Sequence, residues 1–220
     1  MSAHWSVVVP FLRLAENSSR LGADAHALTR SIALDTVAAI ADSTAVAHIV
    51  VVTDENDNTS ELETISTKVA VTIARSLAPA DAWAAVAATH GHVALVRAVL
   101  PALDGHELTA LLVEAATVPL GVVTNAEDNG TTVLVAQSAA ALSVDATDEF
   151  FANRVPTGAA VLDPGTTVRR TVTSARQLVQ VRDWPTLGTR TRAAARAFRL
   201  EPPTTASDRR YRIDPPPAQD

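Results

Sequence analysis

Two hydrophobic patterns alternate along the chain. Short runs rich in Val and Ile are separated by longer stretches in which apolar residues recur every three or four positions. The short runs predict buried strands, and the longer stretches predict amphipathic helices. The expected strands cover 5–11, 47–53, 93–96, 120–124 and 131–136. The expected helices cover 24–42, 77–89, 104–115, 144–153, 166–175 and 190–200.

The order of these elements predicts a Rossmann-like three-layer α/β fold, because strands and helices alternate from the first strand onward. The six residues NAEDNG separate two expected strands and favour a hairpin. The sheet is therefore expected to be mixed and mostly parallel. Residues 67–73 are compatible with a third strand or a helix start, and 178–181 with an edge strand.

The helix after the 93–96 strand has the clearest local signals. Asp104 is placed to cap it, and Glu107 stands three residues on, where a capping box needs its return partner. Ligands of open α/β sheets bind beyond the carboxyl ends of strands, so residues 97–101 should border a site. This segment reads RAVLP and offers no carboxylate.

Composition narrows the class of protein. The 220 residues are 47% hydrophobic and only 4% aromatic, which suits one domain at 1–200 followed by an extended, mobile proline-rich tail at 201–220. The net charge of −6 argues against nucleic-acid binding, which depends on Lys and Arg. The absence of cysteine excludes disulfides and thiolate chemistry. With no membrane-length apolar run and no signal-peptide pattern, the expected compartment is the cytoplasm.

Five short motifs carry the candidate chemistry. They are VVVPF (7–11) with NSSRL (17–21), LAPA (77–80), AVLPAL (98–103), NAEDNGTTVL (125–134) with LDPGTT (162–167), and WPTL (184–187) followed by GTRTR. Their order and spacing resemble the guanylyltransferases that act on 2-phospholactate or phosphoenolpyruvate in deazaflavin coenzyme biosynthesis. The resemblance is spread over most of residues 5–200.

The resemblance implies a nucleotidyltransferase fold of the nucleotide-diphospho-sugar transferase type, with GTP as a substrate and Mg²⁺ as cofactor. It implies that Ser19 and Arg20 bind the nucleotide phosphates. It also implies that Gly130, Thr131 and Thr166 bind the second substrate, a small phosphorylated acid. A homodimer is compatible with the sequence.

The chain departs from the family where the family binds metal. The positions of the metal-binding aspartates fall on Val99, Arg190 and Arg192, none of which can coordinate Mg²⁺. Two interpretations stay open. A divergent enzyme would hold its metal through other carboxylates, for which the candidates are Asp54, Asp57, Asp128 and Asp183. A catalytically degenerate relative would be a ligand-binding or regulatory protein, because arginines can pair with phosphate without metal.

Each candidate also has a structural interpretation. Gly130 and Thr131 would form a turn that enters a strand, and Thr166 with Thr167 would cap a helix. The arginines at 190, 192, 196 and 199 would form one solvated helix face.

Overall fold

A seven-stranded sheet forms the centre of the molecule. The computed structural model describes residues 4–11, 25–53, 60–65, 68–75, 91–138, 141, 143–197, 199–201 and 212–214. In spatial order the strands are β3-β2-β1-β4-β6-β5-β7. Their bounds are Trp5–Pro10 (β1), Val46–Thr53 (β2), Ala70–Arg75 (β3), His92–Val96 (β4), Leu120–Thr124 (β5), Thr131–Ala136 (β6) and Ala160–Leu162 (β7).

The sheet is mixed and mostly parallel, as predicted. Strand β1 pairs in parallel with β2 and β4, and β2 pairs in parallel with β3. Strand β6 runs antiparallel to both β4 and β5. The NAEDNG segment therefore closes a hairpin, and β6 is the one strand of the seven that runs against the rest.

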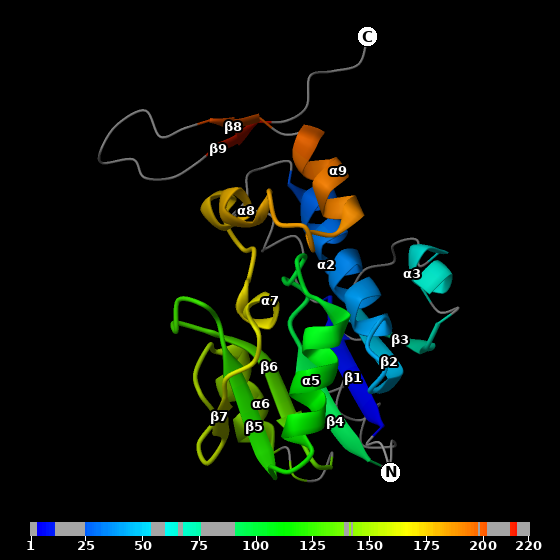
Figure 1. The fold of residues 1–220 in the computed structure, drawn as a ribbon, viewed down its shortest axis with the longest axis vertical. Helices are drawn as coiled ribbons and strands as arrows, with labels where there is room; N and C mark the ends of the chain where they lie inside the picture. Colours follow the sequence, from blue (N-terminus) through cyan, green and yellow to red (C-terminus); the bar gives the residue numbers. More distant parts are fainter. Residues whose placement is uncertain are drawn as a thin grey trace.

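Helices cover both faces of the sheet (Figure 1). Their bounds are His26–Ala41 (α2), Ser60–Ile65 (α3), Gly105–Ala115 (α5), Val144–Phe151 (α6), Thr166–Arg169 (α7), Ala175–Val181 (α8) and Thr189–Ala197 (α9). Arg199–Glu201 (β8) and Arg212–Asp214 (β9) pair as a separate two-stranded sheet. None of the helices among the described residues is long and apolar enough to cross a membrane.

Several predicted elements differ from the structure, were left open by the sequence or lie outside the described residues. The helix expected at 190–200 ends at Ala197, and Arg199 and Leu200 belong to strand β8 instead. The segment 178–181 belongs to helix α8, so its assignment as an edge strand was wrong. The helix expected at 166–175 is two separate helices, α7 and α8. The ambiguous segment 67–73 leads into a strand, β3. The helix expected at 77–89 lies outside the described residues, as does most of the 201–220 tail.

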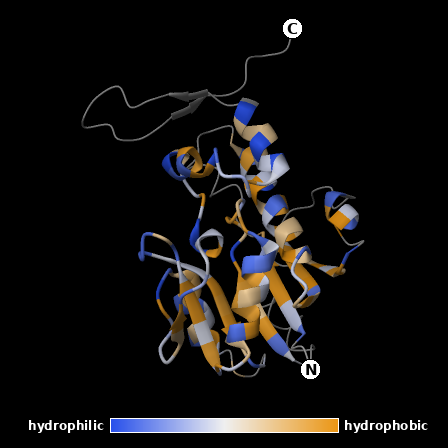
Figure 2. Ribbon diagram, viewed as in Figure 1, coloured by the Kyte–Doolittle hydropathy of each residue, from blue (hydrophilic) through white to orange (hydrophobic). Residues whose placement is uncertain are grey.

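Alternation along the strands builds two cores. Val7 and Val9 of β1 face the larger cluster, which contains residues of α2 and α5, whereas Val8 faces a smaller cluster that contains Phe150 of α6. Since both faces of the central strands are covered, these strands are mostly apolar, as Figure 2 shows.

A third cluster lies beyond the carboxyl ends of the parallel strands. Here Leu28 and Ile32 of α2 pack against Leu178 and Val181 of α8 and against Leu187 in the segment before α9. Helix α9 lies along α2 (Figure 1). This arrangement fixes α8 and α9 above the edge of the sheet where a site is expected.

Candidate functional site

The loop after β4 is held by three segments that are distant in sequence. The Leu100 N–H donates to Thr36 Oγ1 of α2 at 3.0 Å. The Val99 carbonyl accepts from the Val172 N–H, and the Pro101 carbonyl accepts from Gly188, both at 2.8 Å. The loop containing Val99 therefore lies against the segment that leads into α9. The AVLPAL and GTRTR segments meet at the carboxyl edge of the sheet.

The start of α9 is capped by a carboxylate from α2. Asp35 Oδ2 accepts from the Thr191 N–H at 2.7 Å, and Asp35 Oδ1 lies 3.4 Å from the Arg190 nitrogen and 3.5 Å from Arg190 Nη1. The Asp35 side chain is only 3% exposed. Gly188 allows this approach, since a Cβ there would lie 2.2 Å from Asp35 Oδ2.

The three altered metal positions do not fit a magnesium ion. Val99 is a buried hydrocarbon. Arg190 pairs with Asp35, and Arg192 Nη2 donates to the carbonyls of Trp184 and Leu187 at 2.9 and 3.2 Å. Mg²⁺ requires oxygen ligands in an octahedral arrangement, and these side chains provide none.

The two alternative carboxylates that the structure describes are each paired with an arginine. Asp128 is exposed and pairs with Arg169, and Asp183 is exposed and pairs with its neighbour Arg182. Within the part of the chain that the structure describes, no three His, Asp or Glu side chains are grouped so that they could hold a metal ion. Asp54 and Asp57 lie outside that part.

Gly130 ends the turn between β5 and β6, and Thr131 is the first residue of β6. The Gly130 carbonyl accepts from the Asn125 N–H at 2.8 Å, and a Cβ at Gly130 would lie 3.1 Å from Asn153 Oδ1. Thr131 is buried, and its hydroxyl donates to the Phe150 carbonyl at 2.8 Å. These contacts account for both residues structurally. Their role in substrate binding stays a prediction.

Helix α7 is also capped by a carboxylate from a neighbouring helix. Glu107 Oε2 of α5 accepts from the Thr167 N–H at 2.8 Å and from the Thr167 hydroxyl at 2.7 Å. Gly165 precedes α7, and a Cβ on it would lie 2.4 Å from this carboxylate. Thr166 is exposed, and α7 has no cap from its own preceding side chain.

The predicted capping box of α5 is therefore half right. Asp104 accepts from His106 N at 2.8 Å and from Glu107 N at 3.1 Å, so it caps the helix. Glu107 does not return to the Asp104 N–H, which donates instead to Thr167 Oγ1 at 3.0 Å. The Thr167 hydroxyl links the two residues of the predicted capping box, because it accepts from the Asp104 N–H and donates to the Glu107 carboxylate.

Arg97 has a role that the sequence pattern does not reveal. Its guanidinium donates to the Phe150 carbonyl at the end of α6 and lies 4.8 Å from the Phe150 ring centroid. Burial lowers the pKa of Arg97 to about 10. The sequence places Arg97 at the edge of the site, but it carries no signal for this contact with α6. The predicted phosphate-binding residues Ser19 and Arg20, and the LAPA motif, lie outside the described residues.

The fold is that of nucleotidyltransferases. Similar solved structures include a protein from Desulfovibrio desulfuricans provisionally assigned as a nucleotide-diphospho-sugar transferase, with a TM-score of 0.59, 14% identity, and coverage of 89% of this chain and 95% of that chain. They also include 4-diphosphocytidyl-2C-methyl-D-erythritol synthase from Anaerococcus prevotii, with a TM-score of 0.54, 12% identity, and coverage of 82% and 97%. At these identities the likeness concerns the fold.

The chain belongs to the phosphoenolpyruvate guanylyltransferase family. It is 34% identical over 217 residues to the member from Streptomyces avermitilis, which covers 93% of this chain and 99% of the relative. It is 38% identical over 155 residues to the member from Streptomyces scabiei, covering 63% and 71%. The match to the member from Geodermatophilus obscurus is 38% over 143 residues and spans 66% of that relative. No family model matches the chain.

Proposed function

We propose that this protein is a guanylyltransferase-like protein that binds GTP and a small phosphorylated acid, phosphoenolpyruvate or 2-phospholactate, and joins them. In this reaction a phosphate oxygen of the acid bonds to the α-phosphorus of GTP, and the bond from that phosphorus to the bridging oxygen of pyrophosphate breaks. The observation that carries the proposal is the match to the Streptomyces avermitilis relative, a phosphoenolpyruvate guanylyltransferase, over nearly its whole length.

The arrangement at the sheet edge supports the proposal. Nucleotide ligands of open α/β sheets bind beyond the carboxyl ends of the parallel strands. In this protein the loop after β4 and the start of α9 meet there, through the contact between Pro101 and Gly188. Two anions must approach each other in the reaction, so positive groups at this edge would lower their repulsion.

Mg²⁺ would ordinarily accompany GTP and offset the charge of its phosphates. The side chains of Val99, Arg190 and Arg192 do not fit the ion as ligands, so the protein's contribution at these positions is different. Arg192 has donors beyond those bound to Trp184 and Leu187, and a guanidinium can pair with a phosphoryl group in a bidentate manner.

Pyrophosphate release tests the proposal directly. The purified protein is incubated with GTP, Mg²⁺ and either phosphoenolpyruvate or 2-phospholactate, and the guanylylated product is identified by mass spectrometry. Release of pyrophosphate that requires both substrates is expected. Replacing GTP by CTP serves as the control for the base. The absence of product with both acids would refute catalysis.

A second candidate function is ligand binding without turnover. The observation behind it is that hydrocarbon and guanidinium groups stand at all three altered metal positions. Loss of such ligands removes the cation that stabilises the attacking and leaving oxygens. In this case GTP or the acid would raise the melting temperature without forming product.

A further inference from the structure

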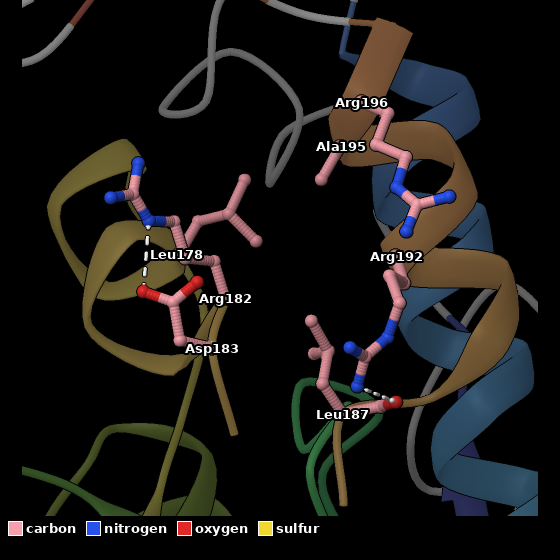
Figure 3. A pocket seen from close by; sticks show the side chains of 7 residues that line it. All are labelled: Leu178, Arg182, Asp183, Leu187, Arg192, Ala195 and Arg196. Atoms are coloured by element: carbon pink, nitrogen blue, oxygen red, sulfur yellow. Dashed lines mark hydrogen bonds and ion pairs between the residues drawn. The ribbon is translucent and has the colours of Figure 1, made fainter. Parts of the chain in front are cut away.

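A pocket of about 370 Å³ lies between α8 and α9 (Figure 3). Its volume is within the range typical of sites for small organic ligands. Leu178, Leu187 and Ala195 provide its apolar lining, and the two leucines belong to the buried cluster that joins α8 to α2. The apolar side of the pocket is therefore built on packed elements.

The charged groups of the pocket are three arginines and one aspartate. Arg192 and Arg196 lie one turn apart on α9, and Arg182 and Asp183 directly follow α8 on the other side of the pocket (Figure 3). Arg182 Nε donates to Asp183 Oδ2 at 3.2 Å. Three positive groups and one negative group leave an excess of two positive charges at the pocket. Like charges repel one another, and an anion bound among them would relieve that repulsion.

Donors remain available in this pocket. Arg192 uses Nη2 for the Trp184 and Leu187 carbonyls, which holds its guanidinium in one orientation. Among the residues that the structure describes, the Arg196 side chain has no hydrogen-bond or ion-pair partner. A guanidinium presents five N–H donors in a planar fork that matches the oxygens of a phosphoryl group.

The pocket adjoins the predicted reaction site. Leu187 lines it, and the next residue, Gly188, donates to the Pro101 carbonyl in the loop after β4. Arg192 also occupies a position where the resemblance puts a metal-binding aspartate in the family. The side chain at this position thus belongs to the pocket, and its charge has the sign of the metal rather than of a metal ligand.

We propose that the α8–α9 pocket binds the phosphoryl groups of a phosphorylated ligand directly, through Arg182, Arg192 and Arg196 and without a divalent cation. The choice of GTP or the phosphorylated acid as the natural ligand rests on the proposed function. The metal-independent binding of a phosphoryl anion is independent of that function.

Isothermal titration with inorganic tripolyphosphate in excess EDTA tests this inference. The wild-type protein binds the probe under these conditions, and higher salt weakens the binding. Arg196→Gln is expected to weaken binding roughly tenfold, because a hydrogen bond to a charged group is lost. Asp183→Asn is expected to strengthen it, because a negative charge leaves the pocket. Arg176→Gln removes an exposed arginine of α8 that does not line the pocket, and it should bind as the wild type does.

The inference is overturned if tripolyphosphate does not bind in EDTA, or if Arg196→Gln and Arg176→Gln behave alike. Competition by GTP or by phosphoenolpyruvate, each in EDTA, identifies the natural source of the phosphoryl group. Pyrophosphate release is measured separately. Binding of tripolyphosphate in EDTA without product formation would refute the proposed catalysis and support metal-independent binding in the pocket. Product formation without binding in EDTA would support catalysis and refute metal-independent binding.

Discussion

Asp35 offers a decisive test of how the site is held together. Its carboxylate is 3% exposed, accepts from Thr191 N at 2.7 Å and lies 3.5 Å from Arg190 Nη1. Asp35→Ala removes the cap of α9, which costs about 0.5–2 kcal/mol. It also leaves a buried N–H without a partner, at a further cost of about 1–3 kcal/mol. The pair with Arg190 adds little, because that arginine is one-third exposed.

The cost of losing the cap and the cost of the unpaired N–H partly count the same hydrogen bond. The expected loss for Asp35→Ala is therefore roughly 2–4 kcal/mol in the free energy of unfolding. A chain of this size changes its melting temperature by about 2–4 °C per kcal/mol. Urea denaturation followed by circular dichroism measures the loss, and Asp35→Asn should recover part of it because an amide oxygen can still accept. Asp148→Ala, which removes an exposed carboxylate from α6, is the matched control and should stay within about 0.5 kcal/mol of wild type. A loss for Asp35→Ala no larger than that of this control would refute the capping argument.

Three further predictions concern neighbouring contacts. Gly188→Ala should destabilise the wild type by about 1–3 kcal/mol, because the new Cβ would lie 2.2 Å from the Asp35 carboxylate. In an Asp35→Ala background the same substitution should cost much less. Additive losses in a double-mutant cycle would contradict this explanation. Glu107→Ala should cost about 1–2 kcal/mol in urea denaturation through loss of the Thr167 contacts, whereas Glu114→Ala on the exposed side of α5 should be neutral. Burial lowers the pKa of His48 in the folded state, so the unfolded chain takes up the proton first and stability should fall as the pH drops below 6.5. His48→Gln should flatten that pH dependence, and equal slopes for the two proteins would count against it.

The sequence predicts the elements whose signals are local. Asp104 followed by apolar residues at helical spacing identifies α5, and all four residues predicted for its apolar face are buried: Leu108, Leu111, Leu112 and Ala115. The hairpin of β5 and β6 follows from a turn segment of six residues. These signals depend on neighbours in the chain, and tertiary packing only reinforces them.

Other features cannot be predicted because their cause lies far away in the chain. Strand β7 has three residues, two of them exposed, and it is a strand only because it pairs with β5. Helix α8 contains a short apolar run, LVQV, whose periodicity does not separate helix from strand. Asp35 looks like a solvated helical residue in the sequence, yet its partners are 155 and 156 positions away.

The same long-range contacts explain why the sequence-based site was only partly informative. The resemblance drew attention to the Val99 loop and the start of α9 as altered positions, and the contact between Pro101 and Gly188 joins the two segments. It could not predict that Glu107, expected to cap its own helix, reaches α7 instead. Side-chain partners of this kind depend on the relative placement of whole helices, which no local pattern encodes.

The distribution of carboxylates at the sheet edge determines what this edge can recognise. Helix N-termini attract anions, but the starts of α7 and α9 already hold Glu107 and Asp35. These carboxylates are committed to backbone N–H groups, so they are poor candidates for holding a metal ion. An aspartate in place of Arg190 would face the buried Asp35 carboxylate and be repelled by it. The arginine at 190 and the aspartate at 35 are therefore coupled, and an aspartate at 190 would also require a change in the cap of α9. With both helix starts occupied, the phosphoryl recognition that we propose at this edge would depend on guanidinium groups.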